Sequence, residues 1–409
     1  MAQDQDLSGE SVEVAAVWTG EEQASFEDVL NAFAEQTGAE VSFTSTGEDI
    51  ATVLGTRIEG GNPPDIALLP QPGLLRDLVE QDALIPIDDI AGDEVDENYS
   101  PIWREFGSVD GTLYGVWFKA ANKSTFWYNV NVFNDAGVSP PEDWDGLQST
   151  ADTISAFGVP PISVAGADGW TLSDWFENVY IRTAGPEMYD QLSNHEIPWT
   201  DQSVRDALGT LAEIFSEEDW LLGGADGALQ TAFPDSVADV FADPASPDAS
   251  MVYEADFVAT VVSNETESVV GEDADFFNFP SIDGSPPSVV GAGDAAVLMV
   301  DTPGGRALME YLATPEAAEI RAEGGGFTSA NLNVDLSVYP DEQLRRSAEA
   351  LTEAGDNVRF DLSDLQPAEF GSTTGQGIWG ELQNFLGNPD DIDQITENLE
   401  EQATRAYGG

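Results

Sequence analysis

Val12-Glu13-Val14-Ala15-Ala16-Val17, followed after Trp18 by Thr19-Gly20-Glu21-Glu22, places a strand just before a helix. A Thr with Glu three residues later is a capping box, the signature of a first helical turn. Apolar residues then recur at Phe26, Val29, Leu30 and Phe33, the i, i+3, i+4, i+7 pattern of an amphipathic helix, before a glycine ends it. This stretch therefore predicts a βα unit.

The same alternation of strand and helix continues along the chain. Further strands are predicted near 41–43, 65–69, 276–280 and 295–300, and further helices near 48–58, 74–79, 302, 314, 341–354, 376–386 and 390–405. The region 140–253 is mostly helical in pattern, with its clearest stripe after Asp201. Alternation of this kind predicts an α/β fold with parallel βαβ units and helices on both faces of the sheet.

The length of 409 residues exceeds what one hydrophobic core usually supports, so two or three domains are expected and two lobes are the first choice. Hydrophobic residues make up 41% of the chain, which supplies the cores. No long flexible linker separates the lobes. We therefore expect the chain to cross between them more than once.

The acidic excess is large and evenly spread. The chain has 77 Asp and Glu against 13 Lys and Arg, a formal net charge of −64. Such a charge repels phosphates, which excludes unassisted binding to nucleic acid or to an anionic membrane. Because salt screens self-repulsion on such a surface, the composition favours a salt-adapted source.

The sequence lacks the residues or motifs that several classes of site require. The chain has no Cys, which excludes thiolate metal sites and Cys nucleophiles, and no apolar run long enough to span a membrane. The single His195 lies in a polar stretch without a Gly-x-Ser-x-Gly elbow, and no phosphate-binding loop is present. Residues 88–98 lack the register of an EF-hand loop. We expect no cofactor, no metal site and no catalytic residue, although two carboxylates across a cleft would suit a glycosidase.

The aromatic residues point to a carbohydrate ligand. Trp18, Trp170 and Trp175 lie beside turns and polar residues, with Asp174 adjacent to the last of them. A flat ring covers the C–H face of a sugar, while carboxylates and amides bind its hydroxyl groups. Each Trp by itself is more often a packing residue, so the grouping carries the argument. The negative charge agrees, because it does not disfavour a neutral ligand.

Several segments, in this order along most of the chain, resemble the extracellular solute-binding proteins (family 1) of ABC sugar importers, which include the maltose- and α-glucoside-binding proteins. The matching segments are Trp18-Thr19-Gly20-Glu21-Glu22, Gly60-Gly61-Asn62-Pro63-Pro64-Asp65-Ile66, Gly111-Thr112-Leu113-Tyr114-Gly115-Val116, Trp127-Tyr128-Asn129 with Phe133, Gly137, Pro140-Pro141 and Trp144, Gly291-Ala292-Gly293-Asp294, and Ala313-Thr314-Pro315-Glu316-Ala317.

The resemblance implies a two-lobed periplasmic-binding-protein-like fold with a hinge and a ligand cleft between the lobes. The expected lobes are 10–118 plus 289–335 and 119–288 plus 336–409. It also implies capture of a neutral sugar or oligosaccharide, of α-glucoside type, and delivery to ABC transporter permease subunits. Export to the cell envelope as a monomer is expected, either periplasmic or lipid-anchored on the outer face of the cytoplasmic membrane.

The ligand-binding residues carried over by the resemblance come from loops expected to face the cleft. They are Trp18, Glu21, Glu22, Gly47, Glu48, Gln71, Lys119, Asn122, Lys123, Trp170, Asp174, Trp175, Glu254, Asp294, Phe327, Asp361 and Trp379. Lys119 and Lys123 are the only lysines in the chain and lie at the expected crossing between lobes.

Two other functions stay open from the sequence. A secreted acidic glycosidase with two cleft carboxylates is the alternative from another class. A receptor for a different polar solute, such as an osmolyte or a peptide, differs from the sugar receptor in its ligand alone.

Overall fold

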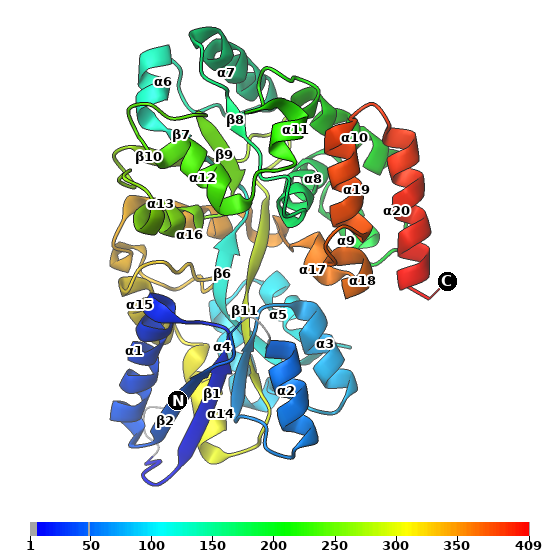
Figure 1. Cartoon of the computed structure of the whole chain (residues 1–409). Coiled ribbons are helices and arrows are strands. Elements are labelled where there is room, and N and C mark those ends of the chain that lie inside the picture. The colour runs from blue at the N-terminus through cyan, green and yellow to red at the C-terminus, as the bar shows by residue number, and fades with distance from the viewer. Residues whose placement is uncertain (1–5, 48–49, 409) are drawn as a thin grey trace. The chain divides into compact units, whose positions relative to one another are not determined.

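The computed structural model describes residues 6–47 and 50–408 and divides the chain into two units (Figure 1). Unit 1 contains residues up to Ala121 together with Ala292–Asp356, and unit 2 contains Asn122–Gly291 and the residues from Asn357 onward. The chain therefore passes between the units three times.

Unit 1 contains an α/β sheet and its covering helices. Its strands are β1 (Ser11–Ala16), β2 (Glu40–Ser45), β3 (Ile66–Leu69), β4 (Ser108–Val109), β5 (Thr112–Leu113), most of β6 (Gly115–Asn122) and most of β11 (Val289–Leu298). Its helices are α1 (Gly20–Thr37), α2 (Ile50–Glu59), α3 (Pro72–Glu80), α4 (Asp88–Asn98), α5 (Pro101–Phe106), α14 (Pro303–Leu312), α15 (Pro315–Glu323), the 3₁₀ turn η2 (Leu336–Val338) and α16 (Glu342–Ala354).

The predicted parallel βαβ units are confirmed in unit 1. β1 pairs in parallel with β2 on one side and β3 on the other, so that the crossovers place α1 and α2 on opposite faces of the sheet (Figure 1). β11 then pairs with β3 in antiparallel orientation, which makes the sheet mixed. Gly293 permits the close approach of β11 to β6, because an added Cβ would lie 2.1 Å from the carbonyl oxygen of Lys119.

The first helix begins and ends where its sequence predicts, with one difference at the cap. Thr19 has the extended backbone of an N-cap, but its side chain accepts no capping hydrogen bond, so the predicted capping box is wrong in its side-chain part. At the other end Gly38 has φ 78°, the left-handed conformation that closes a helix. The two later helices that begin with Thr-Pro do have side-chain caps. The side chain of Thr302 accepts a hydrogen bond from a backbone N–H of α14, and that of Thr314 accepts one from a backbone N–H of α15.

Unit 2 is richer in helices. Its strands are β7 (Thr125–Asn129), β8 (Ile162–Ser163), β9 (Met251–Glu254), β10 (Ala274–Asn278) and β12 (Val358–Phe360). Its helices are α6 (Val130–Ala136), α7 (Trp144–Phe157), α8 (Trp170–Thr183), α9 (Pro186–Ser193), α10 (Gln202–Phe215), α11 (Gly224–Ala228), α12 (Phe233–Phe241), α13 (Val258–Glu265), α17 (Leu362–Leu365), α18 (Ala368–Gly371), α19 (Gly377–Gly387) and α20 (Ile392–Ala406); η3 (Gly355–Asn357) spans the last crossing.

The sheet of unit 2 runs β10-β7-β9-β8 and is buried on both faces. Side chains alternate along β7: Phe126 and Tyr128 face the core formed with α8, whereas Trp127 faces the core formed with α12 and α13. β7 pairs with β9 and β10 in antiparallel orientation, and only β8 runs parallel to its partner β9. The prediction of parallel strands is therefore wrong for most of this sheet, because long helical insertions separate these strands in sequence and leave their direction unspecified.

Residues 336–356 lie in unit 1, whereas the sequence assigned them to the second lobe. They continue the segment that enters unit 1 at Ala292, and the hydroxyl group of Tyr339 accepts a hydrogen bond from the backbone N–H of Ser329 (3.1 Å). Local packing thus keeps η2 and α16 with the preceding residues.

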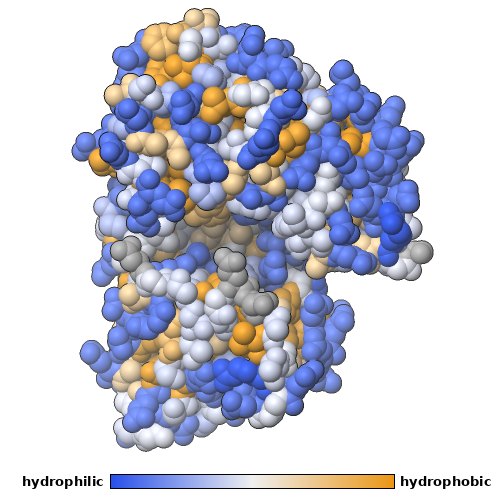
Figure 2. Space-filling model, in the orientation of Figure 1, coloured by the Kyte–Doolittle hydropathy of each residue, from blue (hydrophilic) through white to orange (hydrophobic). Residues whose placement is uncertain are grey.

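Hydrophilic side chains cover most of the face seen in Figure 2. Within the described residues, the large hydrophobic side chains that are exposed are Phe157, Val269 and Leu332. No helix among these residues combines the length and the apolarity needed to cross a bilayer.

Candidate functional site

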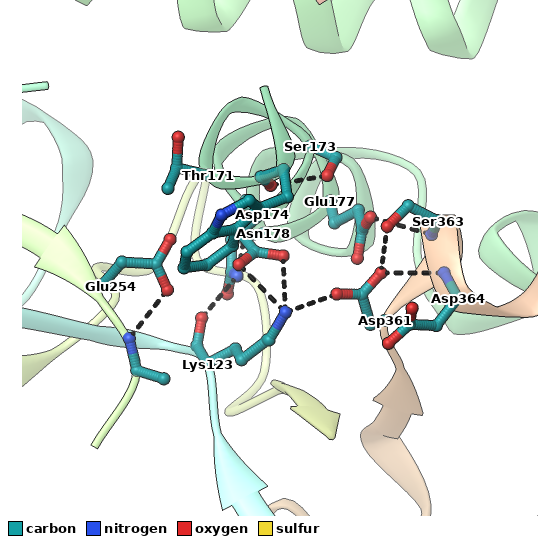
Figure 3. Close-up of polar contacts among 12 residues, drawn as sticks. Lys123, Thr171, Ser173, Asp174, Glu177, Asn178, Glu254, Asp361, Ser363 and Asp364 are labelled. Carbon is teal, nitrogen blue, oxygen red and sulfur yellow. Dashed lines mark hydrogen bonds and ion pairs between the residues drawn. The ribbon is translucent and has the colours of Figure 1, made fainter. Parts of the chain in front are cut away.

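A buried ion cluster lies in unit 2 around Lys123, which follows β6 (Figure 3). Its ammonium nitrogen lies 2.5 Å from Asp361 Oδ2 and about equally far, 3.2 and 3.1 Å, from the two carboxylate oxygens of Asp174. The side chain of Lys123 is 10% exposed, and both carboxylates are almost wholly buried. Lys123 therefore joins α8 to the turn that begins α17.

The local fold holds each carboxylate in place. Asp361 is the N-cap of α17, where its Oδ1 accepts hydrogen bonds from Ser363 Oγ (2.6 Å) and the backbone N–H of Asp364 (3.1 Å). One turn after Asp174 on α8, Glu177 accepts hydrogen bonds from the backbone N–H groups of Leu362 (2.8 Å) and Ser363 (3.1 Å). These bonds connect α8 and α17 on the side of the cluster away from β9.

The electrostatics of the cluster follow from burial and one cation. Burial acts to raise the pKa of Asp361, but Lys123 outweighs it and lowers this pKa to about 2. Burial raises the pKa of Asp174 well above its usual value despite Lys123. At the end of β9, burial raises the pKa of Glu254 to about 8. Burial acts to lower the pKa of Lys123, but Asp174 and Asp361 outweigh it and raise this pKa.

Aromatic rings lie beside the ion cluster. Lys123 Nζ is 5.3 Å from the ring centre of Trp170, which is half-buried at the start of α8. The rings of Phe233 and Phe257, also half-buried, lie 5.4 and 6.2 Å from that of Trp170. Gly169 has φ 82° and would place a Cβ 2.8 Å from Trp379 Cβ, so Trp379 packs directly against the turn that presents Trp170.

The spacing of three carboxylates in this cluster is also compatible with a metal ion. Oxygen atoms of Asp174, Glu177 and Asp361 lie within 4.8 Å of one another. The ammonium group of Lys123 contacts two of the three, however, and so already supplies the neutralising cation. We assign no metal to these residues.

A second cluster of charged and aromatic residues lies in unit 1. Lys119, on β6, donates a short hydrogen bond to Glu22 on α1 and lies 3.7 Å from Asp294 on β11. Its ammonium nitrogen is 5.7 Å from the ring centre of Trp18. Burial raises the pKa of Asp294, although Lys119 opposes this shift.

Arg321 of α15 completes the unit 1 cluster and was missed by the sequence reasoning. Its guanidinium carbon lies 5.5 Å from the ring centre of Trp18 and 5.2 Å from that of Phe327. The side chain is 1% exposed, and its Nε and Nη2 have no hydrogen-bond partner in the structure. Burial lowers its pKa to about 10. A signal was present, because Ala317, Ala318 and Ala322 mark the buried face of α15 and Arg321 lies on that face.

The structure thus groups most of the predicted site residues by unit. Unit 1 brings together Trp18, Glu22, Lys119, Asp294 and Phe327, and unit 2 brings together Lys123, Trp170, Asp174, Glu254, Asp361 and Trp379. Glu48 lies outside the described residues, as does the side chain of Glu21. Glu177, which the sequence reasoning also missed, belongs to the unit 2 cluster through its contacts with the start of α17.

Four predicted residues have other surroundings. Trp175 is 1% exposed in the core of unit 2, where its ring packs 4.6 Å from Tyr253 and 5.2 Å from Phe126, so it offers no free face and we withdraw it from the site. Asn122 is fully buried, and its backbone N–H donates to Asp256 (3.2 Å). Gln71 is the N-cap of α3, and Gly47 lies in the turn after β2 with φ 62°.

Comparison with known proteins places the chain in a family. Residues 18–319 match the family described as bacterial extracellular solute-binding protein. The osmoprotective compounds-binding protein GgtB of Synechocystis is 34% identical over 403 residues, covering 97% of this chain and 93% of the relative. The alpha-glucosides-binding periplasmic protein AglE of Rhizobium meliloti is 33% identical over 404 residues, covering 95% and 86%.

Solved structures agree on the fold. The solute receptor AcbH and apo RafE from Streptococcus pneumoniae each superpose with a TM-score of 0.80 at 18% identity, covering 98% of this chain and 100% and 98% of theirs. These are two-lobed solute-binding proteins, and the predicted fold class is confirmed. The relatives are binding proteins and not enzymes, which confirms the expectation of a non-enzymatic protein. The chain belongs to the bacterial extracellular solute-binding protein family.

Proposed function

We propose that this protein is the substrate-binding component of an ABC importer and that it captures a neutral sugar or oligosaccharide of the α-glucoside type. Support comes from AglE, which binds alpha-glucosides, and from structurally similar receptors for β-D-galactopyranose and raffinose, whereas GgtB binds osmoprotective compounds. No reaction is needed for this role, and we do not favour the glycosidase alternative.

The observation that carries the proposal is the charge balance beside the aromatic rings. Lys119 is bound to Glu22 and Asp294, and Lys123 is bound to Asp174 and Asp361. Because carboxylates occupy both lysines, neither cluster favours an anionic solute. In the unit 2 cluster, carboxylates lie beside half-buried rings, which suits a neutral sugar, since its hydroxyl groups need polar partners and its C–H face needs an apolar surface.

The proposed ligand residues are those of the two clusters, with Arg321 added. Gly47, Gln71 and Asn122 remain weaker proposals, and Glu21 and Glu48 are kept from the resemblance alone. We further propose that the protein acts as a monomer, is exported with or without a lipid anchor, delivers its ligand to permease subunits, and comes from a salt-adapted source. The last proposal rests on the net charge of −64.

Calorimetry against a panel of mono-, di- and trisaccharides tests the ligand class. We expect binding of at least one α-linked glucoside and no measurable binding of its phosphorylated analogue. The same mixtures are assayed for released reducing ends. Turnover of the bound sugar would support the glycosidase instead. If an osmolyte or a peptide bound and no sugar did, the proposed ligand class would be wrong.

Replacing Trp170 with Ala tests the proposed stacking surface. We expect sugar affinity to fall by about 1 to 3 kcal/mol, because the variant loses the apolar face while the ion cluster stays intact. Phe157, an exposed aromatic residue on α7 of the same unit, provides the matched control, and Phe157→Ala should leave affinity unchanged. Equal affinities for the wild type and Trp170→Ala would remove Trp170 from the site.

Replacing Arg321 with Gln tests the unit 1 cluster. Nε and Nη2 of Arg321 lack a hydrogen-bond acceptor, although Nη2 lies 3.9 Å from a carboxylate oxygen of Glu22, and we expect the sugar to supply acceptors to these groups. Affinity should then fall by about 1.5 to 3 kcal/mol in the variant, as for hydrogen bonds to charged groups. Arg57, which binds Glu13 through two bonds of 2.7 Å in the same unit, is the control, and Arg57→Gln should not change affinity. If the role of Arg321 were purely structural, Arg321→Gln would lower the melting temperature and leave sugar affinity unchanged.

A further inference from the structure

Three buried polar residues form a stripe along α8. Asp174, Asn178 and Arg182 are spaced four residues apart, so they lie on one face of the helix. Asp174 and Asn178 are 0% exposed, and Arg182 is 8% exposed. Burying a polar group is unfavourable unless it is hydrogen-bonded, so the partners of the stripe indicate its role. The proposed sugar contacts include only the first of the three residues.

Asn178, in the middle of the stripe, binds the segment that follows the first crossing between the units, after Ala121. Its Nδ2 donates to the carbonyl oxygen of Lys123 (2.9 Å), and its Oδ1 accepts from Ser124 Oγ (2.5 Å). The same Ser124 Oγ accepts from the backbone N–H of Val290 (2.9 Å). Asn178 is therefore connected, through Ser124, to the segment before the second crossing as well.

Arg182, at the end of the stripe, binds the segment before the second crossing directly. That crossing follows Gly291. Nη2 of Arg182 donates to the carbonyl oxygen of Ser288 (2.8 Å), and Nη1 donates to Asn178 Oδ1 (2.9 Å). The guanidinium carbon lies 4.7 Å from the ring centre of Phe279. Because the described hydrogen bonds of Arg182 go to neutral oxygen atoms, this arginine joins α8 to the crossing segment without pairing with a carboxylate.

Asp174, at the start of the stripe, is connected to the third crossing, which follows Asp356. Lys123 bridges Asp174 and Asp361 (Figure 3). The backbone N–H of Asp361 donates to the carbonyl oxygen of Gly291 (2.8 Å), so the segments at the second and third crossings are also bound to each other. One face of one helix thus holds the unit 2 ends of all three crossings.

We propose that Asn178 and Arg182 are positioning residues, which transmit the binding of sugar at the unit 2 cluster to the three crossings. This inference rests on the proposed function. Sugar that binds Asp174 restrains the start of α8, and a helix responds as a rigid element because its backbone hydrogen bonds are internal. Since the stripe fixes the same helix to every crossing, bound sugar should also restrain the backbone there. The crossings join the units, so a site in unit 2 can thereby affect the segments that lead into unit 1.

Hydrogen–deuterium exchange with and without bound sugar tests the proposal. Mass spectrometry follows peptides that cover residues 120–126, 287–293 and 356–363, together with a peptide that contains Trp170. The sugar is the one that binds most tightly among maltose, trehalose and sucrose, which are α-linked glucosides, and calorimetry verifies saturation. In the wild type we expect the sugar to slow exchange in all four peptides by at least about fivefold, the lower end of the usual coupling between two sites.

Two variants interrupt the stripe at different places. Arg182→Met removes the contact with the second crossing and keeps a long apolar side chain. Sugar should still protect the Trp170 peptide, but it should slow exchange in residues 287–293 by less than about twofold. Ser124→Ala is a smaller change, because it removes only the hydroxyl group that joins Asn178 to Val290. It should lose the same protection, and it provides the test if Arg182→Met does not fold.

Tyr180→Phe is the matched control. Tyr180 is also buried on α8, but its hydroxyl group lies 3.0 Å from Ser203 Oγ and donates to the carbonyl oxygen of Met188 (3.4 Å), neither of which belongs to a crossing segment. This variant loses hydrogen bonds and leaves the stripe intact, so sugar should protect the crossings as in the wild type. A loss of protection equal to that in Ser124→Ala would indicate general loosening of α8 and overturn the role of the stripe.

The remaining outcomes separate this role from the proposed function. If sugar binds the wild type and protects the Trp170 peptide but not the crossings, the positioning role is wrong and the sugar-binding function stands. The same conclusion follows if the crossings stay protected in both Arg182→Met and Ser124→Ala. If no sugar of the panel binds the wild type, the proposed function is wrong, and this role is wrong with it.

Discussion

Replacing Lys123 with Met is expected to lower the free energy of unfolding by about 3 to 5 kcal/mol, the usual effect of removing one partner from a buried ion pair. The variant leaves Asp174 and Asp361 buried without their cation. Met fills a similar volume, so the loss reports the missing charge rather than a cavity. Urea unfolding followed by circular dichroism measures it.

Lys119 provides the matched control for this substitution. It also pairs with two carboxylates, but its side chain is 24% exposed and that of Glu22 is 34% exposed. Solvent screening weakens the pair with Glu22, whereas Asp294 is only 7% exposed, so Lys119→Met should lower stability by less than Lys123→Met does. Equal losses in the two variants would contradict a special role for burial at Lys123.

Acid should reduce the difference between the wild type and Lys123→Met. The pKa of Asp361 is lowered to about 2 by Lys123, from a usual value of 3.8. A lowered folded-state pKa contributes stability that is present above the unfolded value and is lost as pH falls through the folded value. The difference should therefore shrink between pH 4 and pH 2. A difference that does not change over this range would show that Asp361 does not depend on Lys123.

Replacing Trp175 with Ala is expected to destabilise the protein by about 3 to 5 kcal/mol, the range for large aromatic residues in a core. Its ring is surrounded by Phe126, Phe215, Tyr253 and Phe279 at centroid distances from 4.6 to 6.2 Å. Denaturant unfolding gives the change, and calorimetry below the transition should show sugar affinity near that of the wild type.

Trp170→Ala should show the opposite pattern, with a large loss of affinity and a smaller loss of stability. Both residues lie on α8, five positions apart, which makes them a matched pair. If Trp175→Ala lost affinity while keeping its stability, the assignment of Trp175 to the core would be wrong.

Much of unit 1 could be predicted from local patterns. The apolar stripe of α1 and its terminal Gly38 predict the helix, and short apolar strands separated by helices predict parallel pairing. The direction of β11 could not be predicted, because its pairing partner β3 lies more than 200 residues earlier in the chain.

For the site residues, too, the sequence could not show which side chains contact one another across distant segments. Every residue of α8 from Thr171 to Arg182 is buried, so the helix has no polar stripe to show which aromatic residue faces a core and which is half-buried at the start of the helix. Arg321 was overlooked because an arginine on a face of small apolar residues resembles a surface residue until Trp18 and Phe327 are placed against it.

The sequence by itself determined the α/β class, the acidic composition, the absence of cysteine and the choice of Lys119, Lys123, Asp174 and Trp170 as candidates. Only the tertiary structure decided that the two lysines belong to different units, one bound to Glu22 and Asp294 and the other to Asp174 and Asp361. Residue spacing specifies secondary structure because those hydrogen bonds are local. The partner of a buried charge, by contrast, lies 51 to 238 residues away and is selected by packing.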